Sequence, residues 1–177
     1  MWRLSYERGD VVNVEFWKPG SIHGDEYYTL LEDAETIASH LLKLPLKVWC
    51  PFNDTGSVWP EVLKNHGFDV AATDTDFFTT APPDGVQCII SNPPFSKKRE
   101  VMDRIKELDL RFALILPFQW LNDGVPLEYG RQLMLFRKRM HFDTPNGVVD
   151  KPRSNCFVLS DGLLDEDLIF IDKKRSG

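Results

Sequence analysis

The chain lacks long hydrophobic runs, and it has no apolar stretch near its N-terminus. Its longest apolar runs have five or six residues, whereas a membrane-spanning helix needs about 20. The first residues, Met-Trp-Arg-Leu-Ser-Tyr, do not resemble the apolar core of a secretory signal peptide. We therefore expect a protein of the cytoplasm with no membrane association.

Cysteine is scarce, and the histidines are scattered. Cys50, Cys88 and Cys156 lie inside apolar runs, and an odd number without tight spacing argues against a disulfide framework or a zinc site. We expect buried thiols in a reducing compartment. The four histidines share no ligand-like spacing, so we expect no bound metal.

A strong positive charge is also missing. The 177 residues carry a formal net charge of −6, which is not typical of a nucleic-acid binder. The charge is uneven, because residues 1–90 hold 6 basic and 14 acidic residues and residues 91–177 hold 15 basic and 13 acidic residues. Basic residues gather at 97–99, at 137–139 and at 151–153. They either neutralise phosphates near a target base or form solvated faces.

Apolar runs and helical patterns alternate from residue 46 onward, with no internal repeat. Short apolar runs predict strands over 46–50, 68–73, 86–91, 112–116, 134–142, 155–159 and 167–171. Helical spacing predicts helices over 57–65 and 98–108. This alternation predicts an α/β, Rossmann-like domain over residues 1–177, with a mostly parallel sheet, helices on both faces and an antiparallel C-terminal strand pair.

The most informative motif follows the apolar run at 86–91 and reads Asn92-Pro93-Pro94-Phe95. Each proline fixes its own φ at about −65° and keeps the preceding residue extended, so the turn holds one shape. The Asn92 side chain and the Pro93 carbonyl offer two acceptors, and Phe95 offers a flat face. This set suits a planar molecule with an exocyclic amino group, such as adenine. A plain proline-rich turn after a strand explains the same residues.

The segment from Ser91 to Phe95 resembles the catalytic motif of S-adenosylmethionine-dependent methyltransferases that modify adenine N6. Related motifs occur in enzymes that methylate guanine N2 or the glutamine amide. The chain is most similar to small phage-encoded adenine-methyltransferase-like proteins, which implies a Rossmann-like methyltransferase fold, S-adenosylmethionine as cofactor, DNA rather than RNA as substrate, and the host cytoplasm as location. The resemblance implies catalytic roles for Asn92, Pro93, Pro94 and Phe95. Substrate contacts are expected from Ser96, Lys97, Lys98 and Phe157.

Two further strand ends carry cofactor candidates, because ligands of parallel sheets bind beyond the carboxyl ends of the strands. Pro51, Phe52, Asp54 and Gly56 occupy the place of the family's acidic-Pro-Phe-x-Gly-x-Gly loop, which holds the methionine part of the cofactor. Cys50 replaces the acidic residue there, and one glycine of the pattern remains. An ordinary strand-to-helix turn would have a similar sequence.

The second strand end carries Asp74, Asp76 and Phe77. An acidic residue at this place can hold a ribose, and Asp76-Phe77 resembles the family's adenine-contacting pair, so the division of roles between the two aspartates stays open. An acidic turn with buried phenylalanines is the alternative. Upstream, Thr29 lies in a segment that resembles the family's Tyr-Thr-Pro segment before a helix, although a plain N-terminal helix would also explain it.

A separate target-recognition domain is not expected, because about 60 residues follow the predicted core. The loop at 143–154 is the candidate for a mobile substrate-contacting segment. A protein partner, recognition of an RNA shape or loose specificity would each account for target choice. Two rival hypotheses remain, methylation of another planar amino group and a non-catalytic S-adenosylmethionine-binding module. The enzyme hypothesis requires a cavity that joins the Asn92 turn to Asp74.

Overall fold

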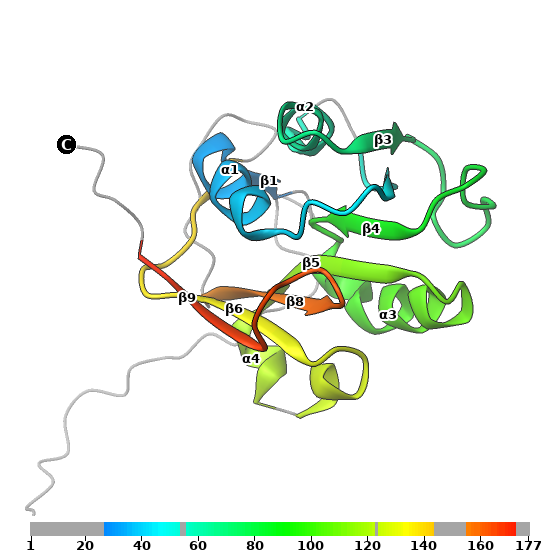
Figure 1. The fold of residues 1–177 in the computed structure, drawn as a ribbon. Coiled ribbons are helices and arrows are strands. Elements are labelled where there is room, and N and C mark those ends of the chain that lie inside the picture. The colour runs from blue at the N-terminus through cyan, green and yellow to red at the C-terminus, as the bar shows by residue number, and fades with distance from the viewer. Residues whose placement is uncertain (1–26, 54–55, 123, 144–154, 173–177) are drawn as a thin grey trace, which may run out of the picture.

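A computed structural model describes residues 27–53, 56–122, 124–143 and 155–172. Helices and strands alternate through most of this range (Figure 1), and two short 3-10 helices are called η1 and η2. The elements are β1 (Tyr28–Thr29), α1 (Leu31–His40), β2 (Lys47–Cys50), α2 (Trp59–Asn65), β3 (Asp69–Ala72), β4 (Cys88–Ser91), η1 (Phe95–Lys97), α3 (Lys98–Glu107), β5 (Arg111–Pro117), α4 (Phe118–Leu121), η2 (Val125–Glu128), β6 (Gln132–Phe136), β7 (Phe142–Asp143), β8 (Cys156–Asp161) and β9 (Leu168–Ile171).

A seven-stranded sheet forms the centre of the molecule, in the order β3-β2-β4-β5-β8-β6-β9. Strands β2 to β5 pair in parallel, and β9 pairs in parallel with β6. Strand β8 runs against both of its neighbours, β5 and β6. The prediction of an α/β fold with a mostly parallel sheet is confirmed. One reversed strand leaves the carboxyl ends of β2, β3, β4, β5 and β6 at the same edge.

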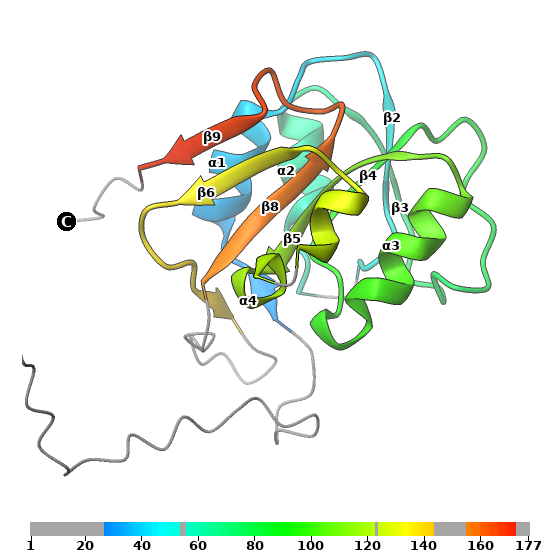
Figure 2. The ribbon, with the colours of Figure 1, turned by 90° about the horizontal axis from the view of Figure 1, so that it is seen from below.

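Helices cover both faces of the sheet, as predicted. In Figures 1 and 2, α1 and α2 lie on one face, and α3 and α4 lie on the other. Successive strand residues point to opposite faces, so Ile90 packs in a cluster with Ile37 of α1 and Val62 of α2. Its neighbour Ile89 packs with Ile105 of α3. The buried strands therefore read as continuous apolar runs, which made them visible in the sequence.

The predicted strand over 134–142 is wrong in one respect, because the chain turns between β6 and β7. The side chain of Asn155 holds this turn: its Nδ2 donates to the Phe136 carbonyl oxygen over 3.2 Å, and its Oδ1 accepts from the backbone nitrogens of Met140 and Cys156 over 3.4 and 3.0 Å. The turn lets Phe142 leave the large sheet and pair with β1 instead.

The two-residue pair of β1 and β7 places the segment before α1 beside the carboxyl edge of the large sheet. The strands pair antiparallel, with Tyr28 opposite Asp143 and Thr29 opposite Phe142. Thr29 is brought in this way toward residues that lie more than twenty positions further along the chain, at the ends of β2 and β4.

The three cysteines are buried free thiols, as the sequence predicts. Burial raises the pKa of Cys50, Cys88 and Cys156 from 9.0 to about 12 in each case. Such thiols stay protonated at neutral pH and are poor nucleophiles. No helix within the described residues is long and apolar enough to cross a membrane.

Candidate functional site

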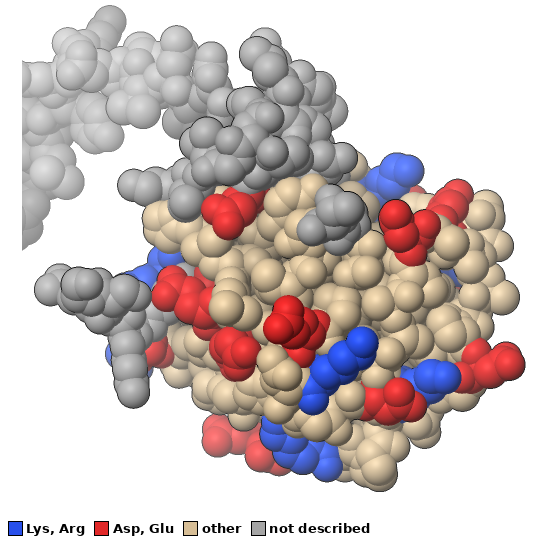
Figure 3. Space-filling model, turned by 90° about the horizontal axis from the view of Figure 1, so that it is seen from above, with Lys and Arg blue, Asp and Glu red and all other residues tan. Residues whose placement is uncertain are grey.

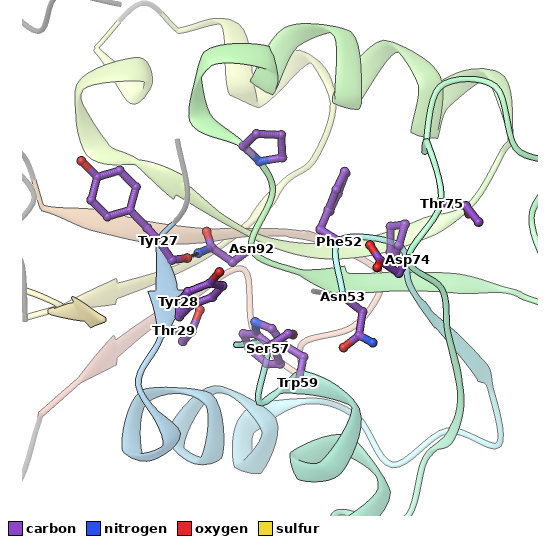
Figure 4. Close-up of a pocket in the computed structure, with 12 residues that line it drawn as sticks. Tyr27, Tyr28, Thr29, Phe52, Asn53, Ser57, Trp59, Asp74, Thr75 and Asn92 are labelled. Carbon is purple, nitrogen blue, oxygen red and sulfur yellow. Dashed lines mark hydrogen bonds between the residues drawn. The ribbon is translucent and has the colours of Figure 1, made fainter. Parts of the chain in front are cut away.

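A cavity of about 260 Å³ lies at the carboxyl edge of the sheet, between the ends of β2, β3 and β4 (Figure 4). Its wall combines residues from three strand ends with residues of β1 and α2. The lining residues are Tyr27, Tyr28, Thr29, Pro51, Phe52, Asn53, Ser57, Trp59, Asp74, Thr75, Asn92 and Pro94. The cavity therefore joins the Asn92 turn to Asp74, which is the arrangement that the enzyme hypothesis requires.

Backbone and side-chain bonds fix Asp74 at the edge. Phe52 and Asp74 form an isolated antiparallel bridge, and the Thr73 nitrogen donates to the Cys50 carbonyl oxygen over 3.2 Å. The indole nitrogen of Trp49 donates to the Thr73 hydroxyl oxygen over 2.9 Å. These bonds connect the loop after β2 to the loop after β3. They hold Asp74 at the cavity rim, where its side chain is exposed.

The Asn92 side chain has a defined orientation. Its Nδ2 donates to the Tyr27 carbonyl oxygen over 2.7 Å, and because a carbonyl can only accept, the amide cannot be turned around without losing this bond. The remaining atom, Oδ1, is buried and has no hydrogen-bond partner. Less than 1 Å² of this oxygen is exposed, so a ligand reaches it only if the surrounding side chains move. The arrangement leaves an acceptor that suits an N–H group of a ligand.

Two further lining residues carry a buried polar atom without a partner, the Thr29 Oγ1 and the Trp59 Nε1. The residues are 4% and 3% exposed. Among the described residues, five buried side-chain polar atoms lack a partner, and three of them belong to residues that line this cavity. Folded proteins leave few such atoms unpaired, because each costs about 1–3 kcal/mol. Three such atoms on the residues of one cavity make this cavity the candidate ligand-binding site.

The remaining residues of the Asn92 turn hold its shape. Pro93 is buried and Pro94 lines the cavity. The Phe95 ring stacks on Tyr27 with centroids 6.2 Å apart, and it lies nearly perpendicular to the Phe142 ring with centroids 6.3 Å apart. Phe95 does not line the cavity in this structure. It supports Tyr27, whose carbonyl oxygen in turn orients Asn92.

The predicted cofactor residues divide into two groups. Thr29, Pro51, Phe52 and Asp74 line the cavity. Asp76 is exposed, and its Oδ1 accepts from the Phe78 nitrogen over 2.9 Å, so it stabilises a turn. Phe77 is 2% exposed and packs behind Phe52 with centroids 5.0 Å apart.

The loop after β2 is described in part. Asp54 lies outside the described residues. At Gly56, a Cβ would lie 2.6 Å from atoms of the Tyr28 ring, so glycine is the residue that permits this close approach. The loop and β1 therefore pack tightly at the side of the cavity.

The predicted substrate contacts lie outside the cavity. Ser96 and Lys97 are exposed on η1, and the Lys97 Nζ lies 5.2 Å from the centre of the Phe78 ring. The Lys98 Nζ donates to the Phe95 carbonyl oxygen over 3.3 Å. Phe157 is fully buried and points to the α3 side of the sheet, in the core cluster that contains residues of α3 and α4. Residues 144–154 of the predicted substrate loop lie outside the described residues.

Charged side chains of both signs lie on the surface. On the side of the molecule seen in Figure 3, from above the view of Figure 1, acidic and basic side chains are interspersed without a large patch of one sign. At the carboxyl edge, η1 and α3 bring residues 97–99 after β4, and residues 137–139 follow β6. Arg99 and Arg139 are exposed there.

Six lining residues were not predicted: Tyr27, Tyr28, Asn53, Ser57, Trp59 and Thr75. Most are immediate neighbours of predicted residues, so the rule that ligands bind at strand ends could have included them. Trp59 is different, because its apolar character predicts a core position and gives no hint of the unpaired nitrogen.

Within the described residues, no group of three or more His, Cys, Asp or Glu side chains could hold a metal ion. No protein-family model matches the chain, and no curated protein sequence matches it.

Proposed function

We propose that this chain is an S-adenosylmethionine-dependent methyltransferase with a Rossmann-like fold. It transfers a methyl group to the exocyclic N6 of adenine in nucleic acid, with DNA favoured over RNA. The observation that carries the proposal is the cavity that joins Asn92 to Asp74. The Oδ1 of this lining asparagine is buried and unpaired. The motif resemblance supplies the chemistry, and the position beyond the carboxyl ends of parallel strands is where such sheets bind nucleotides.

The lining residues fit the chemistry of S-adenosylmethionine. The Asp74 carboxylate can accept hydrogen bonds from ribose hydroxyls, and Phe52 offers an apolar wall. The Thr29 hydroxyl and the Trp59 N–H, which lack a partner in the protein, can donate to the amino-acid end of the cofactor. The cavity volume of about 260 Å³ lies slightly below the range of about 300–1,000 Å³ for small-molecule sites. When bound, this cofactor supplies an electrophilic methyl group.

Asn92 would orient the acceptor amine. Its Oδ1 accepts one hydrogen of the amino group, while the bond from its Nδ2 to the Tyr27 carbonyl oxygen holds the amide still. The Pro93 carbonyl is the proposed second acceptor. Two acceptors draw the hydrogens out of the ring plane and localise the nitrogen lone pair. Rate enhancement would come from positioning and from dipoles fixed before the reaction. Transfer would break the sulfur–methyl bond and release S-adenosylhomocysteine, and the methylated nitrogen would then lose one proton to solvent, so the chain needs no general base of raised pKa.

A polyanionic acceptor suits the carboxyl edge. The basic residues at 97–99 and 137–139 follow β4 and β6, so they lie on the same side of the sheet as the cavity. An adenine in a duplex would have to leave the base stack, at a cost of a few kcal/mol. The described part of the chain forms one large sheet and the short β1–β7 pair, so target choice would fall to residues 144–154 or to a protein partner.

A second candidate is a module that binds S-adenosylmethionine without transferring the methyl group. The observation that favours it is the packing of Phe95 on Tyr27 and Phe142, which leaves the motif's ring engaged rather than open to a base. Enzymatic transfer to guanine N2 or to a glutamine amide would use the same acceptors.

Incubation with methyl-labelled cofactor and separate pools of DNA, RNA and protein tests these candidates. The proposal predicts label in nucleic acid that nuclease releases and protease does not. Label released by protease alone would indicate a glutamine amide. Calorimetric binding of the cofactor without label in any pool would replace the proposed enzyme with the binding module.

A further inference from the structure

We propose that the indole N–H of Trp59 binds the carboxylate of the cofactor and selects ligands that carry this group. The inference rests on the proposed function and deepens it, because it names a residue that the sequence motifs do not include. Trp59 is the first residue of α2 and lines the cavity.

The unpaired state of the indole nitrogen is the first argument. Trp59 is 3% exposed, yet its Nε1 has no hydrogen-bond partner. An indole N–H can only donate, so an acceptor atom of a ligand that enters the cavity can satisfy it. A buried donor without a partner costs about 1–3 kcal/mol, and an anionic acceptor removes this cost most effectively because charge-assisted hydrogen bonds are about twice as strong.

The distribution of polar groups around the cavity is the second argument. In Figure 4, Trp59 and Thr29 lie toward α1 and α2, and Asp74 and Thr75 lie on the opposite side. Among the twelve lining residues, Asp74 is the one with a charged side chain. The Trp59 end therefore offers donors with no lining carboxylate to repel an anion, and the Asp74 end offers an acceptor for hydroxyl groups. A nucleoside with a carboxylate at its far end matches both ends.

Selectivity follows from the unpaired donor. A nucleoside thioether without the carboxylate would fill the apolar part of the cavity but leave the Trp59 N–H without an acceptor. A site built around a buried polar group rejects an analogue that lacks the matching group. We expect S-adenosylhomocysteine to bind more tightly than 5′-methylthioadenosine for this reason.

Titration calorimetry with these two ligands tests the inference. Trp59→Phe removes the N–H and keeps an aromatic ring, so it should weaken S-adenosylhomocysteine binding about tenfold. The same change should alter 5′-methylthioadenosine binding less than about twofold, since that ligand has no group for the donor. Trp120→Phe, on α4 at the other face of the sheet, is the matched control and should change neither affinity.

Each outcome decides a different point. Equal affinity of wild type and Trp59→Phe for S-adenosylhomocysteine would overturn the role of Trp59 and leave the proposed function standing. Failure of the wild type to bind either ligand would overturn both. If Trp59→Phe does not fold, the NMR resonance of the Trp59 indole N–H in the wild type tests the role of Trp59 instead. It should move downfield with S-adenosylhomocysteine and stay in place with 5′-methylthioadenosine, and the absence of this difference would reject the proposal.

Discussion

Asp74 and Asp76 show how two similar residues, two positions apart, acquire different surroundings. Both are exposed aspartates after β3. The bridge between Phe52 and Asp74 places the first at the cavity, whereas the Asp76 side chain is bonded to the Phe78 nitrogen. The sequence left their roles open, and the backbone geometry now assigns the cavity position to Asp74.

We expect Asp74→Asn to weaken S-adenosylhomocysteine binding by about tenfold or more, because a hydrogen bond to a charged group contributes about 1.5–3 kcal/mol. Asp76→Asn is the matched control, and its affinity should stay within about threefold of wild type, a difference under about 0.7 kcal/mol. Calorimetry on both variants checks this. A larger loss with Asp76→Asn than with Asp74→Asn would reverse the assignment.

The elements of the sheet differ in how well the sequence reveals them. The runs that became β2, β4 and β5 are buried on both faces, so every residue is apolar or nearly so, and the pattern is unmistakable. The pair of β1 and β7 has two residues per strand, which is too short for any periodicity. Its formation depends on contacts between distant parts of the chain.

The residues of the candidate site also differ in how well the sequence reveals them. Phe52 and Asp74 were predicted because they follow strand ends, and Thr29 was predicted because its segment resembles a Tyr-Thr-Pro segment before a helix. Phe157 was expected at the substrate, but it lies on the α3-facing side of β8, where its ring is buried. Sequence alone gives the alternation along this strand without saying which set of side chains faces which layer.

The turn between β6 and β7 depends on Asn155, which makes three bonds to backbone atoms. Asn155→Ala should lower the free energy of unfolding by about 1–3 kcal/mol, since buried backbone groups lose their partner. It should also weaken S-adenosylhomocysteine binding, because β7 holds β1 at the cavity. Urea unfolding and calorimetry measure the two effects. The exposed Asn122→Ala is the control, and equal stability of both variants would show that the Asn155 bonds do not hold the turn.

At the scale of the whole molecule, the buried thiols link stability to pH. The pKa of all three is raised from 9.0 to about 12 by burial, so above pH 9 the unfolded chain releases protons that the folded chain keeps. Their contribution to stability is therefore complete below pH 9 and is lost as the pH rises toward 12.

We expect the urea midpoint to fall as the pH rises above 9 toward 12, the interval between the ordinary and the raised pKa values of these thiols. A variant with alanine at Cys50, Cys88 and Cys156 will be less stable at pH 8 because it loses buried side chains, but its midpoint should fall less with pH. The slope, rather than the stability at one pH, is the quantity compared. If the urea midpoints of wild type and variant fall equally with pH, the thiols do not cause the loss of stability at high pH.

The most direct test of the account is methylation of DNA, and in parallel of RNA, by the wild type and by Asn92→Ala, with the products digested to nucleosides and identified by mass spectrometry. Removal of one preorganised hydrogen-bonding group from a reaction site lowers turnover by about 10²–10³-fold. We therefore predict N6-methyladenine from the wild type, at least about 100-fold less from Asn92→Ala, and wild-type activity from the control Asp161→Asn, at the opposite edge of the sheet. Equal N6-methyladenine from wild type and Asn92→Ala, or none from the wild type on either nucleic acid, would contradict the account.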